Sequence, residues 1–379
     1  MRPEVAEAMT AGLGDLYANP SSMHREGQRA RAAIERAREQ VAALVNADSG
    51  EVVFTSGGTE GDHLAILGAA WALAFKGRRI AISAVEHHAV HGAAELLAEQ
   101  DWTVDHLPVG RDGRVDPNHG AVAPGTTLVS LMLANNETGV LQPVAELARR
   151  AHAAGALVHC DAVQAAGKVV VDFRALDVDY LVVSAHKIGG PKGAGALVVR
   201  RGAMIAPLFR GSGQEFGFRA GTENLTGIVG LGAAAEWAAR DLAAEATRLM
   251  PLRLRLEAGI RELAPAAVIH GADAPRLPNT VNASFPGARS DHLLMALDAR
   301  GIAVSAGAAC ASGAVEPSPV LSAMGVPREL AVCALRLSMG RTTTAADVEA
   351  VIGALREAVP VTAAAGARAL VAAEPGTPA

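Results

Sequence analysis

Residues 179–199 read DYLVVSAHKIGGPKGAGALVV, and this stretch decides the fold. Its apolar runs, 179–184 and 195–199, do not alternate with polar residues, which is typical of strands buried on both faces of a sheet. A turn rich in glycine joins the two runs and carries Lys187. The stretch therefore predicts two buried strands and a stiff turn that holds this lysine in place.

Strand-like and helix-like runs alternate on the N-terminal side of this stretch, after a first 45 residues with a helical pattern. The predicted strands cover residues 51–55, 79–83, 127–132 and 156–160, and the predicted helices between them cover 60–75, 91–100 and 144–154. Such alternation predicts an α/β fold with a mostly parallel sheet and helices on both faces. Sheets of this kind bind ligands beyond the carboxyl ends of their strands.

The pattern changes on the C-terminal side. It becomes helical from about residue 225 to 263, is β-like at 267–270 and 280–285, and ends in a predicted helix at 345–358. A length of 379 residues agrees with two domains, at roughly 150 residues each as a prior. We expect a large α/β domain over 1–250 and a smaller α+β domain over 251–379. A frayed tail rich in Ala and Pro is expected from about residue 364.

Composition excludes several classes of protein. Half of the residues are apolar, which argues against disorder, and the net charge of −5 lacks the basic excess of a nucleic-acid binder. No window approaches the ~20 apolar residues of a membrane helix, and the N-terminus lacks the apolar core of a signal peptide. Cys160, Cys310 and Cys333 are too scattered for a disulfide framework or a metal cluster. We therefore expect a cytoplasmic protein that binds no nucleic acid, membrane or metal.

Polar residues capable of chemistry follow five successive predicted strands. The turn at 56–60 is rich in glycine and opens a helix, so its backbone N–H groups suit a phosphate, although an ordinary strand-to-helix turn has the same pattern. The five turns are SGGTE at 56–60, EHH at 86–88, NNETG at 135–139, DAVQ at 161–164 and SAHK at 184–187. Five such turns in register indicate one ligand site at a sheet edge.

One cofactor uses these residue types together. A lysine in an apolar pocket can form a Schiff base, and an aspartate can keep a ring nitrogen protonated. An imidazole can stack on the ring, and an amide side chain can bond a phenolic oxygen. This set predicts a pyridoxal phosphate site. A surface lysine is the ordinary alternative for Lys187, but the stiff turn at 188–193 disfavours it.

Motifs along nearly the whole chain extend this prediction. They are NPSSMH at 19–24, FTSGGTE at 54–60, EHHAV at 86–90, NNETG at 135–139, HCDAVQ at 159–164, SAHKIGGPKG at 184–193, GQE at 213–215, RAGTEN at 219–224, GAAC at 307–310 and LRLS at 335–338. In these motifs the chain resembles the cysteine desulfurases, which belong to the class V aminotransferase-like, fold-type I pyridoxal phosphate enzymes. The resemblance covers residues 3–352.

The resemblance implies a role for each matching residue. The residues implied to be catalytic are Lys187, Cys310 and His87. Lys187 would form the Schiff base, and His87 would stack on the ring. The residues implied to hold the cofactor are Gly58, Thr59, Ser184 and His186 at the phosphate, Asp161 at the ring nitrogen, and Asn136 and Gln164 near the phenolic oxygen. Thr222 would reach the phosphate of the other subunit, which implies a homodimer. Arg336 would bind the substrate carboxylate through its planar guanidinium.

Cys310 decides the reaction. It lies among Gly and Ala residues, where a mobile thiolate could take sulfur from L-cysteine, although a buried small hydrophobe is the ordinary reading of a free cysteine. Cys160 and Cys333 are read as buried. The expected function is conversion of L-cysteine to L-alanine, with a persulfide on Cys310 passed to an acceptor protein for iron–sulfur cluster, thio-cofactor or tRNA biosynthesis. The spacing from Cys310 to Arg336 resembles the longer-loop branch of the family.

Some positions depart from the family pattern. The chain starts at Met1-Arg2-Pro3, without the strand that usually precedes this helix, and Asp62-His63, Ser212 and Phe216 differ from the usual residues. Without that strand we expect normal cofactor binding and dimerisation but weak handling of L-cysteine. The alternatives are another class V lyase or transaminase, of the selenocysteine lyase type, and a catalytically weakened dimeric relic.

Overall fold

The structure is a computed structural model that describes residues 1–306 and 316–373. The chain divides into two compact units, each described here by itself. The first contains Met1–Pro108, Val115–Asn135 and Gln142–Ala243, and the second contains Val109–Arg114, Asn136–Leu141 and the chain from Ala244 onward. Helix α7, Leu225–Leu263, therefore contributes its first part to one unit and its second part to the other.

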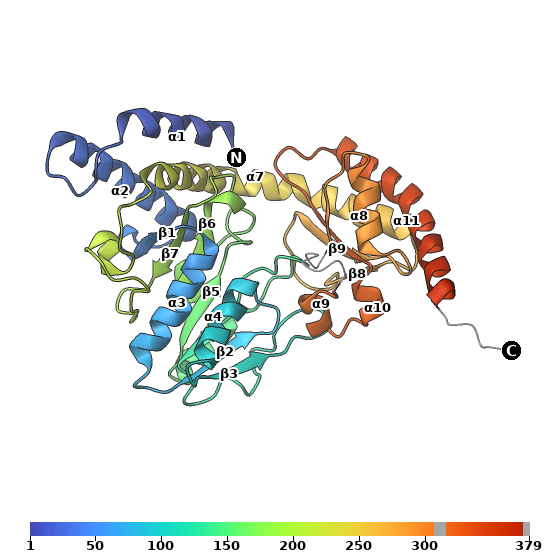
Figure 1. Cartoon of the computed structure of the whole chain (residues 1–379), viewed down its shortest axis with the longest axis horizontal. Coiled ribbons are helices and arrows are strands. Elements are labelled where there is room, and N and C mark those ends of the chain that lie inside the picture. Colours follow the sequence, from blue (N-terminus) through green and yellow to red (C-terminus); the bar gives the residue numbers. More distant parts are fainter. Residues whose placement is uncertain (307–315, 374–379) are drawn as a thin grey trace. The chain divides into compact units, whose positions relative to one another are not determined.

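A seven-stranded sheet forms the centre of the first unit, with strand order β1-β7-β6-β5-β4-β2-β3 (Figure 1). The strands are β1 Val52–Thr55, β2 Arg79–Ser83, β3 Thr103–Leu107, β4 Leu128–Ser130, β5 Leu157–Asp161, β6 Tyr180–Ser184 and β7 Gly195–Val199. Only β7 runs against its neighbours, and the pairs from β6 across to β3 are all parallel. The prediction of a mostly parallel sheet is confirmed.

Burial explains which strands the sequence revealed. Every residue of β6 and β7 is buried, as expected of continuous apolar runs. Strand β3 was missed by the sequence reading because it alternates apolar and polar residues, with Thr103 and His106 exposed. It lies at the sheet edge, where Arg79 of β2 pairs with Asp105 at 2.5 Å. Charged side chains on an edge strand also discourage further pairing.

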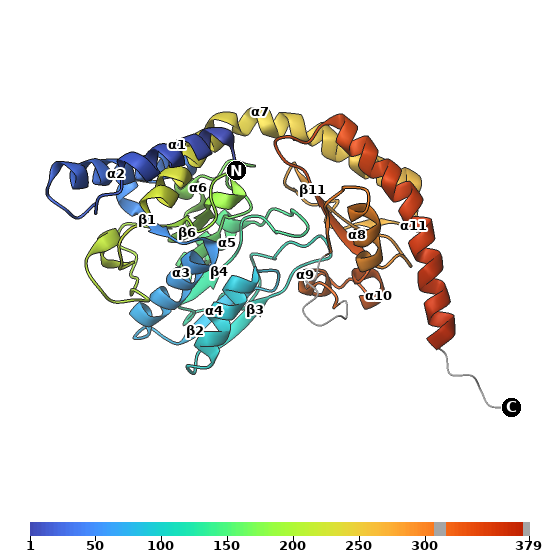
Figure 2. The same ribbon diagram turned by 45° about the horizontal axis from the view of Figure 1, so that its top comes forward.

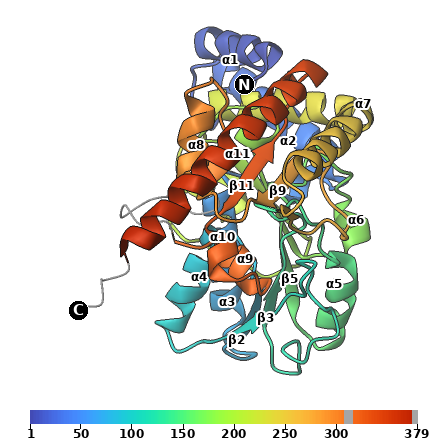
Figure 3. The ribbon, with the colours of Figure 1, turned by 90° about the vertical axis from the view of Figure 1, so that its right-hand side faces the viewer.

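Helices cover both faces of this sheet. Helices α3, Gly58–Leu73, and α4, His88–Ala98, pack together on one face, and α5, Val144–Ala153, lies on the other, with the short α6, Phe173–Leu176, next to α5 (Figure 3). Ten residues of α3 are buried, which explains why its sequence is apolar almost all round. The core between α3, α4 and the sheet includes Leu64, Ile66 and Ile82.

Two helices at the N-terminus pack on the first part of α7. They are α1, Pro3–Asp15, and α2, Arg25–Val45, and both lie alongside α7 (Figure 2). Two glycines of α7 allow this approach. A Cβ at Gly230 would lie 2.8 Å from Cγ of Met9, and a Cβ at Gly232 would lie 2.6 Å from Cα of Ala37. A side chain at Gly232 would push α2 away from α7, and one at Gly230 would force the side chain of Met9 to move.

The second unit contains an antiparallel four-stranded sheet in the order β10-β11-β9-β8. Its strands are β8 Val268–Ile269, β9 Thr280–Ser284, β10 Ser305–Ala306 and β11 Ala334–Ser338, and its other helices are α8 Ser290–Asp298, α9 Pro319–Ala323, α10 Arg328–Ala331 and α11 Ala345–Ala373. Helices α8 and α11 pack together, and α8 contacts the sheet. The buried side chains of Phe285, Leu293 and Leu355 share this core.

The last helix is longer than the sequence indicated. Helix α11 continues past Pro360 to Ala373, whereas the predicted helix ends at residue 358 and a frayed tail was expected from about 364. Alanine makes up much of this segment and has the highest helix propensity, which offsets the unfavourable proline. The single O–H of Thr362 donates to the carbonyls of Ala358 and Val359, at 2.8 and 3.1 Å, close to the proline.

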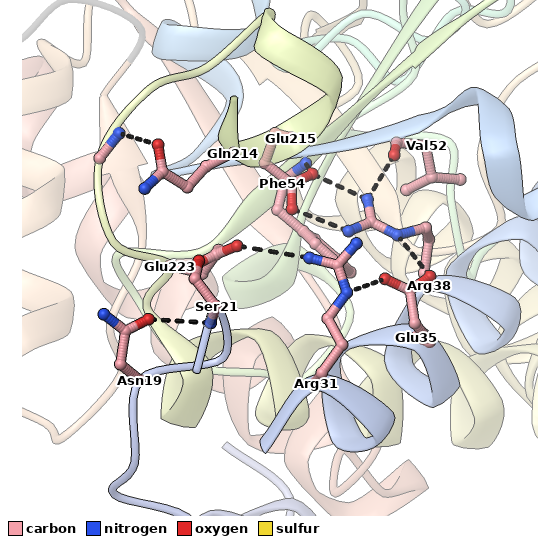
Figure 4. Close-up of polar contacts among 11 residues, drawn as sticks. Asn19, Ser21, Arg31, Glu35, Arg38, Val52, Phe54, Gln214, Glu215 and Glu223 are labelled. Atoms are coloured by element: carbon pink, nitrogen blue, oxygen red, sulfur yellow. Dashed lines mark hydrogen bonds and ion pairs between the residues drawn. The ribbon is translucent and has the colours of Figure 1, made fainter. Parts of the chain in front are cut away.

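A buried ion pair ties α2 to the loop that contains the 3₁₀ turn η3, Gln214–Gly217. The guanidinium of Arg38 donates to both carboxylate oxygens of Glu215, at 2.7 and 2.8 Å, and to the carbonyl of Val52 (Figure 4). Glu215 also accepts from the backbone N–H of Phe54. Glu215 and Phe216 both have positive φ angles, 45° and 59°, which non-glycine residues rarely adopt. The ion pair holds this strained turn against β1.

Substitution of Glu215 by Ala is expected to destabilise the chain strongly. It leaves a charged Arg38, 1% exposed, and the N–H of Phe54 without their acceptor, a loss of about 3–5 kcal/mol for breaking a buried pair. Urea unfolding measures the change. Glu26→Ala is the matched control, since Glu26 and Arg29 form a pair with both side chains about half exposed, worth at most about 1 kcal/mol. Equal losses in the two variants would contradict this account.

Candidate active site

The strand directions bring four of the predicted turns to one edge of the first unit. Strands β1, β2, β5 and β6 all end at that edge, because β1 is parallel to β6 through the reversed β7. Gly58, His87, Asp161 and Lys187 follow or end these four strands. The fifth turn follows β4, and from Asn136 to Leu141 it belongs to the second unit.

Lys187 is held by a rigid turn. It ends the 3₁₀ turn η2, Ala185–Lys187, directly after β6. The carbonyl of Ala185 accepts from the N–H groups of Ile188 and Gly190, and the N–H of Ala185 donates to Ala194. Gly189 has φ +87°, where a side chain would be strained. The glycines that follow the lysine therefore fix the backbone from which its side chain extends.

Asp161 supplies a buried carboxylate at the end of β5. Its Oδ1 accepts from the backbone N–H of Val163 at 2.8 Å. Burial raises the pKa of Asp161 to about 6, while that hydrogen bond and the positive charge of Lys187 act in the opposite direction. A buried carboxylate near a lysine, in a setting that disfavours an isolated negative charge, is suited to bind a cationic group of a ligand.

Three further buried side chains, those of His159, Ser130 and Asp62, contact one another next to Asp161, and the sequence analysis assigns none of them to the site. His159 lies two residues before Asp161 on β5, so the two side chains share one face of the strand. Its Nδ1 is 2.8 Å from the hydroxyl of Ser130, and its Nε2 is 3.3 Å from Oδ1 of Asp62. Burial lowers the pKa of His159 to about 3. The imidazole is therefore neutral beside these groups.

Burial also shifts the pKa values of the neighbouring acids, Asp62 and Glu86. Burial raises the pKa of Asp62 well above its usual value, and the charges of Asp161 and Glu86 raise it further. Burial and Asp161 likewise raise the pKa of Glu86, which accepts from the N–H of Met132. The negative charge of Asp161 therefore makes ionisation of Asp62 and Glu86 less favourable. The sequence signal for this cluster is the spacing of two residues between His159 and Asp161, which places both side chains on the same face of β5.

His87 is placed at the start of α4. It is the N-cap residue, and its Nδ1 accepts from the backbone N–H of Ala89 at 3.2 Å. The neutral ring therefore carries its proton on Nε2. Burial lowers the pKa of His87, with further contributions from His88, Lys187 and His91. An imidazole that stays neutral near neutral pH can give and accept a proton.

A helix N-terminus and a hydroxyl suit a phosphate group. Helix α3 begins at Gly58 after Gly57, which provides no side-chain cap, so N–H groups of its first turn are left for a ligand. A Cβ at Gly58 would lie 3.0 Å from Cγ2 of Val163, so a side chain there would force Val163 to shift. The hydroxyl of Ser184 lies 2.9 Å from Nδ1 of His186. Thr59 is exposed.

The other predicted residues are placed as follows. Gln164 accepts from the ammonium of Lys168 through its backbone carbonyl and its amide oxygen, at 2.7 and 3.3 Å. Thr222 is exposed after Gly221. In the second unit, Arg336 of β11 donates to the carbonyl of Asn136 and to the hydroxyl of Ser305. Oδ1 of Asn136 is buried, and within the part of the chain that the structure describes it has no hydrogen-bond partner.

The cysteines divide in two groups. Cys160 and Cys333 are buried, as predicted, and burial raises the pKa of both thiols, so neither is a ready thiolate. Cys310 lies outside the residues that the structure describes.

Comparison with known proteins identifies the family. The profile of the family described as aminotransferase class-V matches residues 1–351. The chain belongs to the aminotransferase class V family. It is 43% identical to a cysteine desulfurase IscS of Dictyoglomus turgidum over 95% of this chain and 92% of the relative. It is 47% identical to a cysteine desulfurase of Cereibacter sphaeroides over 94% of this chain and 92% of the relative.

Solved structures of similar proteins agree with the fold. A NifS-like protein superposes with a TM-score of 0.88 at 35% identity, over 95% of this chain and 96% of that one. The DndA protein of Streptomyces lividans superposes with a TM-score of 0.76 at 37% identity, over 89% of this chain and 96% of that one. The predicted fold-type I architecture is thereby confirmed.

The residues at the sheet edge fit pyridoxal phosphate, the cofactor that class V membership implies. The buried carboxylate of Asp161 suits the protonated ring nitrogen of the cofactor, and the amine of Lys187 suits its aldehyde. The start of α3, which has no side-chain cap, suits its phosphate. Among residues 1–306 and 316–373, no group of His, Cys, Asp and Glu is arranged to hold a metal ion. Over the same residues, every helix is too short or too polar to cross a membrane.

The raised pKa of Asp161 predicts a pH-dependent stability of the chain freed of cofactor. An unfolded Asp has a pKa of about 3.9, so the folded chain keeps a proton here that the unfolded chain has lost. The corresponding stability is present at low pH and is lost as the pH rises through about 6. Between about pH 4 and pH 7 the wild type should lose about 2–3 kcal/mol more than Asp161→Asn.

Urea unfolding at several pH values measures this difference. Asp116→Asn is the matched control, because Asp116 is exposed and its replacement should leave the wild-type pH dependence unchanged. Parallel stability curves for the wild type and Asp161→Asn would show that burial does not shift the titration of Asp161.

Proposed function

We propose that this chain is a cysteine desulfurase, which releases L-alanine from L-cysteine and leaves the sulfur on Cys310 as a persulfide. The observation that carries the proposal is the placement of Lys187 and the buried Asp161 at the ends of the neighbouring strands β6 and β5. Class V membership and 43–47% identity to named cysteine desulfurases support it. An acceptor protein would take the sulfur from Cys310.

Pyridoxal phosphate, when bound, withdraws electrons from the α-carbon of an amino acid and so lets bonds near that carbon break. Lys187 would bind it covalently and then exchange protons with the substrate. Asp161 would keep the ring nitrogen protonated, a role that its burial beside a cation supports. His87 would stack on the ring and move a proton through Nε2, the nitrogen left free by its cap.

Other residues would fix the orientation of cofactor and substrate. Gly58, Thr59, Ser184 and His186 would hold the phosphate, and Asn136 and Gln164 would donate to the phenolic oxygen. Thr222 would reach the phosphate in the partner subunit of a homodimer, in agreement with its exposure. Arg336 would bind the carboxylate of L-cysteine. Nε of this arginine is buried and has no hydrogen-bond partner among residues 1–306 and 316–373.

The sulfur transfer balances without an added oxidant. The bond between Cβ and sulfur of L-cysteine breaks, and a bond forms between that sulfur and Sγ of Cys310. The carbon fragment takes up protons and leaves as L-alanine, and the thiol of Cys310 becomes a persulfide. The buried Cys160 and Cys333 have no part in this step.

Lys187 is expected to be the only lysine that borohydride fixes to pyridoxal phosphate. Peptide mass spectrometry of the reduced protein locates the added mass. Lys187→Ala should retain no cofactor after reduction and lose desulfurase turnover by orders of magnitude, because the proton-transfer group is gone. Lys192→Ala, a change in the same turn, should behave as the wild type. Cofactor fixed to Lys192 or to Lys168 would overturn the assignment.

Cys310→Ser is expected to keep cofactor binding and to lose sulfur release from L-cysteine almost completely, because a hydroxyl cannot accept the sulfur. Sulfide and alanine are assayed together, and mass spectrometry identifies the persulfide in the wild type. Cys333→Ser serves as the control with one buried thiol removed. A persulfide on Cys160 or Cys333, or turnover by Cys310→Ser near that of the wild type, would contradict the proposal.

A further inference from the structure

The turn that carries Lys187 packs against one face of α7. A Cβ at Gly190 would lie 3.0 Å from Cβ of Ala234, and a Cβ at Gly230 would lie 2.9 Å from Cγ of Pro191. Gly230 and Ala234 are four residues apart in α7, so they lie on the same face of this helix. The turn therefore lies directly on that face of α7.

The same face of α7 also holds the side chain of Arg2, which directly precedes α1 alongside α7 (Figure 2). Trp237 and Asp241 follow Ala234 by three and seven residues, which keeps them on this face. The guanidinium of Arg2 donates to Oδ2 of Asp241 at 2.7 Å, and its Cζ lies 5.6 Å from the centre of the Trp237 ring. With these two contacts the side chain of Arg2 is only 11% exposed.

Arg2 contacts the turn itself as well. Its backbone N–H donates to the carbonyl of Gly189 at 2.8 Å. Apart from the sequence neighbours of this glycine, the three atoms nearest to a Cβ placed there are Cγ, Cδ and Nε of Arg2, at 3.0, 3.5 and 3.6 Å. Gly189 lies two residues after Lys187. The arginine therefore joins α7 to the turn at a point close to this lysine.

We propose that Arg2 is a positioning residue of the candidate active site, which clamps the turn that carries Lys187 onto α7. The inference rests on the proposed function, in which Lys187 binds the cofactor. A lysine has a long and flexible stem, so its amine reaches a fixed place only if the backbone that carries it stays fixed. A shift of about 1 Å in a reacting group can slow a reaction by up to about 100-fold, so the clamp would act on the rate at which Lys187 reacts.

Hydrogen–deuterium exchange tests the clamp without the reaction. The full-length chain is freed of cofactor, and mass spectrometry follows the peptide that covers residues 185–194. In Arg2→Ala the backbone bond to Gly189 can still form, but the stem that covers this glycine and the ion pair with Asp241 are lost. Asp241 is 29% exposed and is still paired with Arg240, so the fold should be retained. The amides of the turn should then exchange about fivefold faster than in the wild type.

The second measurement is the rate at which pyridoxal phosphate attaches to Lys187 of the same chain, followed by absorbance after the cofactor is added. Arg2→Ala should slow this attachment about fivefold, because the amine is presented in the right place for a smaller fraction of the time. Arg2→Lys keeps a stem and a cation and should keep most of the wild-type rate. Asp241→Asn removes the ion pair but not the arginine, so it should show a smaller change in the same direction.

Arg240→Ala is the matched control for these variants. Arg240 lies 3.2 Å from the centre of the Trp237 ring and also pairs with Asp241, but its side chain is 59% exposed. The three atoms nearest to a Cβ at Gly189 all belong to Arg2 and none to Arg240. Loss of Arg240 should therefore change neither the exchange of the turn nor the rate of attachment. A general weakening of α7 would affect both variants alike.

The outcomes separate this role from the proposed function. Unchanged exchange of the turn in Arg2→Ala, or equally fast exchange in Arg240→Ala, would overturn the clamp. Faster exchange with an unchanged rate of attachment would show that Arg2 stabilises the turn without positioning Lys187, which would also overturn the proposal. A chain with the expected exchange and attachment that releases no alanine from L-cysteine would overturn the proposed function alone.

Discussion

The common direction of six strands is the constraint on which the site depends. Strands β1 to β6 all run the same way, although β7 lies between β1 and β6. Their carboxyl ends therefore meet at one edge, and residues far apart in sequence gather there without any contact that is specific to them. The glycines after β1 and β6 then set the local backbone, so that a helix start and a lysine are presented at fixed positions.

Burial at this edge of the sheet affects which of the titratable side chains are charged. Asp161, Asp62 and Glu86 lie in a setting that opposes ionisation, and His159 is kept neutral in the same setting. Two lysines lie nearby. Lys187 lies in the turn after β6, and Lys168 lies in the turn after β5. A cationic group placed next to these carboxyls would lower the cost of their ionisation, because it would offset their negative charge.

Much of this arrangement could be predicted from the sequence, because buried parallel strands leave continuous apolar runs and the chemical residues follow those runs directly. The strand ends at Asp161 and Ser184 were located in this way. The edge strand β3 was missed since half-exposed strands alternate, and the end of α11 was missed since alanine outweighed Pro360. The proximity of Asp62 to His159 is visible only in the three-dimensional packing, because the two residues are far apart in sequence. The role of Cys310 rests on sequence alone.

The second unit is built from segments that are far apart in sequence, and this affects the order in which the two units fold during synthesis. Residues of the segment Asn136–Leu141 find their partners only much later in the chain: the N–H of Leu141 bonds the carbonyl of Pro275, and the N–H of Leu277 bonds the carbonyl of Gly139. During synthesis on a ribosome this loop emerges before its partners exist. The first unit can collapse around its sheet early, whereas the second must wait for the end of translation to close its core. Neither unit is a contiguous stretch of the gene, so neither can be obtained by simple truncation.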